Sequence, residues 1–210
     1  YLQNVYESWP AVVRKEAEVK KLRIIQVLPK TTPHSNNPRV GFANASPGKQ
    51  VLGTVPVESD GSAYFEAPAR IPIAFQALDE HGMAIQTMRS LTYLQPGEHI
   101  SCVGCHEHRS STPRSQQQAL AQLRPASKIA PGPDGSRPFS YPLLVQPVLD
   151  KHCVRCHQGV DAAGGVSLTG EPAGDFTTSY QALAKLVPYS EWKGTPQANH
   201  EPLTKPNLFG

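Results

Sequence analysis

The sequence predicts an α+β protein, in which a small antiparallel β-sandwich over residues 1–130 precedes a small, mainly helical module over residues 131–210. Short β-branched runs separated by turn signals fill the first half, whereas helix-starting signals lie mainly in the second. A run of proline and glycine at 131–135 (PGPDG) interrupts both patterns. Because such a run ends regular structure, we place the boundary between the two domains there.

Five short runs in the first half predict strands. The turns ESDG at 58–61 and DEHG at 79–82 predict hairpins, because glycine supplies the positive φ that tight turns need. Regular short strands joined by such turns are typical of a β-sandwich. The predicted strands are 22–28, 51–57, 62–67, 73–78 and 85–88.

Helices are expected at three places. A short one is predicted over 116–123, a second over 143–150 with Pro142 at its first position, and a third over 179–186 with Ser179 as its cap. The chain then ends with apolar residues but without a terminal helix. We therefore expect the second domain to continue further or to have been truncated at its C-terminus.

All four cysteines fall into two C-x-x-C pairs, and a histidine follows each pair directly. C-x-x-C-H is the motif that attaches haem c, in which two thiols bond the macrocycle and the imidazole binds the iron. We therefore predict two haem c groups. The first is attached at Cys102 and Cys105 with His106 as proximal ligand, and the second at Cys153 and Cys156 with His157 as proximal ligand.

Zinc and disulfides are the alternatives to haem. A zinc ribbon places its second C-x-x-C about 15–20 residues after the first, whereas residues 106–152 separate these two pairs, so zinc is not expected. A disulfide or redox pair needs no histidine at equivalent places. Haem also explains how a chain with 21 prolines and only 7% aromatic residues completes a core, and it predicts a poorly ordered apo-chain.

The distal iron ligands are open, and with them the reactivity, because a second protein ligand closes the iron whereas an open face permits chemistry. His34 lies in a long loop that is able to cover the first haem. His99 and His152 lie just before the motifs and are able to reach the neighbouring haem, and His200 is able to fold back onto the second. Each of the four is alternatively a surface histidine. No catalytic residue is assigned.

Charge and hydropathy restrict the partners. The net charge of +3 comes from mixed signs without basic clustering, which argues against nucleic acid. No stretch reaches the roughly 18 apolar residues that span a bilayer, and the first ten residues lack a secretory pattern, so we interpret the chain as a mature or excised form. Because bacterial haem c is attached outside the cytoplasmic membrane, we expect a periplasmic or extracellular protein.

Several runs resemble the hydrazine synthase alpha-subunit-like family: LGTVPV at 52–57, DGSAYF at 60–65, FQALD at 75–79, SCVGCHE at 101–107, and the stretch from Pro131 through the second motif. The resemblance covers most of 22–210. It implies the middle and C-terminal haem domains of that subunit, without the β-propeller found upstream in the family. It further implies an active-site haem at the first motif and a bis-histidine relay haem at the second.

One position departs from the family. In that family, the iron of the active-site haem is held by a tyrosine four residues after the motif histidine, and the histidine itself binds zinc. In this chain the equivalent position is Ser110. His106 is therefore expected to be an ordinary iron ligand. The favoured function is electron transfer with redox partner proteins, and with other subunits or copies in an assembly. The alternative is an enzyme that acts on small nitrogen compounds or peroxide at the first haem, with the second as electron relay.

Overall fold

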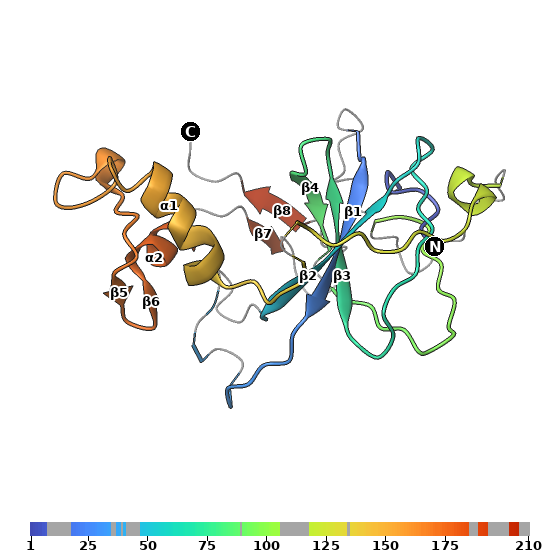
Figure 1. The fold of residues 1–210 in the computed structure, drawn as a ribbon, viewed down its shortest axis with the longest axis horizontal. Helices are drawn as coiled ribbons and strands as arrows, with labels where there is room; N and C mark the ends of the chain where they lie inside the picture. The colour runs from blue at the N-terminus through green and yellow to red at the C-terminus, as the bar shows by residue number, and fades with distance from the viewer. Residues whose placement is uncertain are drawn as a thin grey trace. The chain divides into compact units, whose positions relative to one another are not determined.

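The computed structural model describes residues 1–7, 18–34, 37–38, 40, 47–88, 90–105, 118–133, 135–184, 189–192 and 202–205. It divides into two compact units (Figure 1). The first comprises Tyr1–Leu28 and Gly48–Pro138, and the second comprises Pro29–Pro47 and Phe139–Gly210. An antiparallel sheet in the first unit and short helices in the second make the chain α+β.

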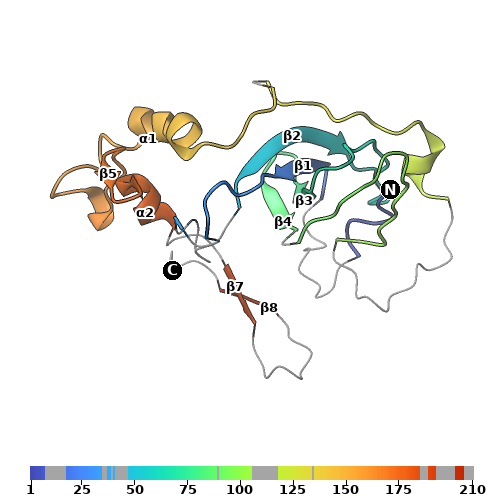
Figure 2. The ribbon, with the colours of Figure 1, turned by 90° about the horizontal axis from the view of Figure 1, so that it is seen from below.

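The first unit contains one four-stranded antiparallel sheet with the order β2-β1-β3-β4 (Figure 2). Strand β1 pairs with β2 on one side and with β3 on the other, so that Leu22 of β1 lies opposite Val55 and Ala77. The predicted strands over 22–28, 51–57, 73–78 and 85–88 are confirmed, and so is the hairpin between the last two. The bounds are β1 Lys21–Val27, β2 Lys49–Pro56, β3 Ile73–Leu78 and β4 Ala84–Thr87.

One face of this sheet carries the core of the unit. Leu22 and Ile24 alternate along β1 with the polar Lys21 and Arg23, as the period of two in a strand requires. Burying each such side chain contributes roughly 1.5–3 kcal/mol. The buried cluster that they join contains Leu2, Val5, Val19, Val55, Ala63, Ile73 and Ala77.

The predicted sandwich is wrong for the described residues of the first unit, which contain no second sheet. The turn at 58–61 forms, with Gly61 at φ +84°. The run 62–67 then leaves β2 instead of pairing with it, because Ala63 bridges Leu2 and Phe65 bridges Ser127. Extended segments joined by isolated bridges therefore cover the core where a second sheet was expected.

The segment 127–138 also belongs to the first unit, so the unit extends beyond the proline and glycine run at 131–135. The backbone groups of Ala130 and Thr54 hydrogen-bond each other in both directions, at 2.8 and 2.9 Å. Gly53, beside this bridge, has φ +147°. A side chain at Gly53 would place its Cβ 2.2 Å from the Ala130 carbonyl oxygen.

We expect Gly53→Ala to destabilise the first unit by about 2–4 kcal/mol, since backbone strain and steric overlap add. Urea unfolding followed by circular dichroism measures the loss. Gly82→Ala is the matched control, because Gly82 has φ +77° but its Cβ would meet nothing within 4 Å. A loss at Gly53 no larger than that at Gly82 would show that segment 127–138 does not pack there.

The second unit contains strands as well as helices. A π-helical turn over Tyr141–Val145 leads into α1 (Gln146–His152), and a small hairpin of β5 (Pro172–Ala173) and β6 (Phe176–Thr177) precedes α2 (Thr178–Ala184). β7 (Tyr189–Trp192) pairs with β8 (Pro202–Lys205), a hairpin that the sequence did not suggest. The strands make this unit mixed rather than mainly helical.

The predicted helices at 143–150 and 179–186 are confirmed over the residues that the structure describes. The cap of α2 is Thr177 rather than Ser179, because the Thr177 hydroxyl oxygen accepts the Tyr180 amide at 3.2 Å. The helix expected over 116–123 is a single 3₁₀ turn over Leu120–Leu123, and residues 116–117 lie outside the described part. No helix within the described ranges has the length and apolarity needed to cross a bilayer.

Candidate haem-attachment sites

The second motif continues the helical path of α1. The amide of Cys153 donates to the Leu149 carbonyl at 2.8 Å, and the amides of Cys156 and His157 both donate to the Cys153 carbonyl, at 3.1 and 3.0 Å. Residues three and four apart on a helical path share a face. The two thiols and the imidazole of this motif therefore come from one short, internally bonded turn.

The imidazole of His157 is oriented by the backbone of a later segment. Its Nδ1 lies 3.1 Å from the carbonyl oxygen of Val166. Because a carbonyl only accepts, Nδ1 carries the proton and Nε2 keeps its lone pair. Hydrogen bonding of one ring nitrogen to a carbonyl is how proteins orient histidines that bind metals through the other. This arrangement fits an iron ligand.

The second unit also has a small core of its own. Outside β7 and β8, the buried apolar side chains in its described part are only Ala162 and Leu168. Exposed apolar side chains are more numerous in the same unit, and a macrocycle bonded to the two thiols would supply the missing apolar surface. The residues present therefore fit haem c. The exposed side chains are Phe139, Leu143, Val148 and Val160.

The first motif has a different backbone. It lies alongside the segment 1–7, with the Cys102 amide donating to the Tyr1 carbonyl at 2.9 Å and the Cys105 amide donating to the Glu7 carbonyl at 2.8 Å. Both cysteines pack against the core cluster of the sheet. His106 lies outside the described residues, so the structure describes only the two cysteines of this site.

Burial, followed by the charge of Cys102, raises the pKa of the Cys105 thiol to about 11. A thiol with such a pKa stays protonated near neutral pH and is a poor nucleophile. None of the four cysteines is in a disulfide. Cys105 is therefore not the low-pKa thiolate of a thioredoxin-like redox site.

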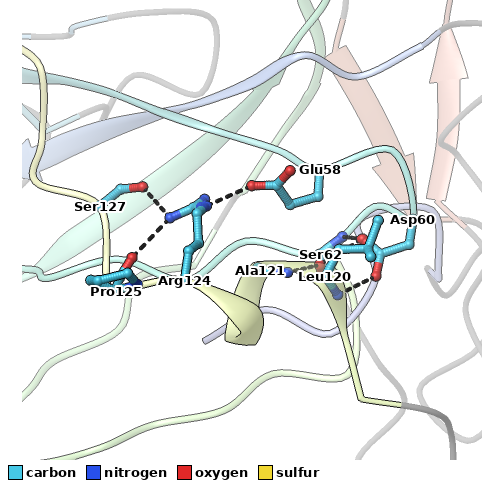
Figure 3. Close-up of polar contacts among 8 residues, drawn as sticks. All are labelled: Glu58, Asp60, Ser62, Leu120, Ala121, Arg124, Pro125 and Ser127. Atoms are coloured by element: carbon cyan, nitrogen blue, oxygen red, sulfur yellow. Dashed lines mark hydrogen bonds and ion pairs between the residues drawn. The ribbon is translucent and has the colours of Figure 1, made fainter.

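Beyond residues 106–117, the chain is fastened to the turn at 58–62 (Figure 3). The Asp60 carboxylate accepts the Leu120 amide at 2.9 Å, and the Ser62 hydroxyl oxygen accepts the Ala121 amide at 3.0 Å. An ion pair at 2.7 Å joins Arg124 to Glu58. The segment Leu120–Arg124 is thus bound to the turn at 58–62 of the first unit.

This network predicts an acid-sensitive contribution to stability. Burial alone would raise the pKa of Asp60, but hydrogen bonds from Ser62 and Leu120 outweigh it and lower the pKa below the ordinary 3.8. Because its pKa is lower in the folded protein than in the unfolded chain, the ionised Asp60 carboxylate stabilises the fold at pH values above the ordinary pKa. This stabilisation is lost as the pH falls below about 4. We expect Asp60→Asn to flatten that acid limb in thermal unfolding. An unchanged acid limb in Asp60→Asn would refute this assignment.

The candidate distal histidines belong to no cluster of three or more possible metal ligands in the described part of the chain. His34, His99 and His152 have exposed side chains, and His152 ends α1 directly before Cys153. His200 lies outside the described residues, as does Ser110. The distal ligands therefore stay predictions.

Sequence reasoning missed two parts of these sites. One is the Val166 carbonyl, which no side-chain pattern marks. The other is Gln146, the first residue of α1, whose polar side chain is only 6% exposed. The sequence signal that could have found Gln146 is its spacing: it lies seven residues, or two helical turns, before Cys153.

Comparison with known proteins places residues 17–107 in a match to the family model "Hydrazine synthase alpha subunit middle domain". Hydrazine synthase subunit alpha from Kuenenia stuttgartiensis is 32% identical over 103 residues, which is 42% of this chain and 13% of that subunit. The solved structure of Kuenenia stuttgartiensis hydrazine synthase matches 87% of this chain and 33% of its own, with a TM-score of 0.64 and 22% identity. The chain thus spans a small part of its curated relative, and the structural match supports the fold.

Proposed function

We propose that this chain, whose residues 17–107 match the hydrazine synthase alpha subunit middle domain, is a member of that family that carries two haem c groups and transfers electrons. The observation that carries the proposal is the 3.1 Å contact between His157 Nδ1 and the Val166 oxygen. Because this contact keeps the proton on Nδ1, Nε2 is free to bind the iron. The same helical turn carries the two thiols of the motif. When bound there, haem c supplies an iron that accepts and releases single electrons.

The residues of the second motif have distinct roles in this proposal. Cys153 and Cys156 bond the macrocycle, and His157 binds the iron through Nε2. The Val166 carbonyl keeps the proton at Nδ1, which raises the basicity of the ligand nitrogen. Apolar side chains of the second unit would help to exclude water from the bound group.

Chemistry at the first haem is the second candidate function. It is supported by the place of Cys102 and Cys105 inside the region that matches the middle domain, and by a backbone at this motif unlike that at the second. The reaction would act on small nitrogen compounds or peroxide, with the second haem as relay. An iron with an open axial face distinguishes this function from electron transfer.

The partners and the compartment follow from the same premise. The curated relative is a "subunit alpha", so we propose that this chain assembles with other subunits or copies and with redox partner proteins. Covalent haem attachment outside the cytoplasmic membrane supports a periplasmic or extracellular location.

Carbon monoxide binding to the reduced, haem-loaded chain separates the two functions. Electron transfer predicts two low-spin irons that do not bind carbon monoxide. The variant Cys102→Ser with Cys105→Ser should retain one such iron, at the second motif. Carbon monoxide binding by this variant would contradict the relay role of the second haem. Binding that is seen only while the first motif is intact would favour the enzyme.

A further inference from the structure

Gln146 is a buried amide whose polar atoms all have partners. Its Oε1 accepts the Ser179 hydroxyl at 2.5 Å. Its Nε2 donates to the Asp150 carboxylate at 2.7 Å and to the Leu168 carbonyl oxygen at 3.1 Å. An amide nitrogen has two donors, so both are used. Gln146 therefore joins α1, α2 and the segment around Leu168.

The segment around Leu168 is also the one that orients His157. The Leu168 amide donates to the His157 carbonyl at 2.9 Å. The carbonyl oxygen of Leu168 in turn accepts a hydrogen bond from Nε2 of Gln146. Two residues earlier, Val166 accepts the imidazole Nδ1–H. A shift of Leu168 would thus move the acceptor of the imidazole proton.

Glycines allow this close approach. Gly164 and Gly165 have φ +61° and +68°, and they turn the chain back toward the motif. A Cβ at Gly170 would lie 3.0 Å from Cγ of Gln146, closer than ordinary packing. The segment is therefore built to lie directly against the Gln146 side chain.

We propose that Gln146 is a positioning residue for His157: by holding Leu168, it keeps the Val166 carbonyl at the imidazole Nδ1. The inference rests on the proposed function, in which His157 binds the iron. A firm hydrogen bond at Nδ1 makes the ligand more basic and stabilises the oxidised iron. Loss of Gln146 therefore raises the reduction potential of the second haem.

The test compares Gln146→Met with Ser179→Ala in the full haem-loaded chain. Both substitutions break the Ser179–Gln146 hydrogen bond in the same buried cluster, but only Gln146→Met releases Leu168. NMR of ¹⁵N-histidine-labelled ferrous protein reports exchange of the Nδ1 proton, and redox titration reports the potential. Gln146→Met should speed that exchange about tenfold and shift the potential of the second haem upward. Ser179→Ala should leave both unchanged while it lowers the unfolding midpoint comparably.

The proposal is overturned if Gln146→Met lowers the unfolding midpoint but leaves proton exchange and potential as in Ser179→Ala. If Gln146→Met does not fold, Gln146→Asn replaces it, since an amide one methylene shorter does not span Leu168 and Ser179 together. Haem missing from the second motif of the parent chain would refute the proposed function instead. A second unit that is folded without haem would still show, by Nδ1 proton exchange in the same two variants, whether Gln146 positions His157.

Discussion

The double substitution Cys153→Ser with Cys156→Ser is expected to remove one of two haems and to unfold the second unit while the first stays folded. Outside β7 and β8, the described part of the second unit buries only Ala162 and Leu168 as apolar residues, so we expect it to depend on the macrocycle for its core. Amide hydrogen exchange measures the outcome residue by residue. Protection in α1 and α2 should disappear, and protection in β1 and β3 should persist.

The matched control is Cys102→Ser with Cys105→Ser, which removes the other haem. The first unit has a core built from side chains such as Val5, Ile24 and Val55, so its sheet should stay protected in this control. Native-like protection of α1 and α2 after loss of the second motif would show that the second unit is stable without haem. The apo-chain would then be ordered, against the expectation from its composition.

Gly104→Ala is expected to have the largest effect at the first motif. A Cβ at this buried position would lie 1.8 Å from the Glu7 carbonyl oxygen, which is the acceptor of the Cys105 amide. The segment 1–7 must then move away and release that hydrogen bond. We expect the first unit to lose about 2–4 kcal/mol from overpacking and the broken bond together. Urea unfolding measures this loss, and haem content per chain should fall toward one.

Gly132→Ala is the control for that substitution, because its Cβ would meet nothing within 4 Å and its φ is not in the left-handed region. Its stability should stay within about 0.5 kcal/mol of the parent. If Gly104→Ala were equally harmless, the segment 1–7 would not lie against the first motif.

Local patterns in the sequence predict strands and turns well in this chain. β-Branched runs locate β1 and β2, and the turn that ends in the glycine at 82 locates the hairpin of β3 and β4. The partners of the strands are harder to predict, because pairing depends on distant segments. The run 62–67 has good strand character, yet Ala63 pairs with Leu2 far away in the chain. The sandwich prediction failed for this reason.

The candidate sites divide in the same way. Spacing alone identifies the cysteines and histidines of both motifs. The environment of His157 depends on a glycine turn that returns Val166 to the imidazole, and on Gln146 that holds the returning segment. Backbone acceptors leave no trace in residue type, so this part of the site needs the fold.

Intact mass of the chain, produced together with a system that attaches haem c, tests the central claim most directly. The account predicts the polypeptide plus two haems, with proteolytic fragments carrying one haem at Cys102 and Cys105 and one at Cys153 and Cys156. A chain at its bare polypeptide mass, with all four thiols open to alkylation after denaturation, would contradict it.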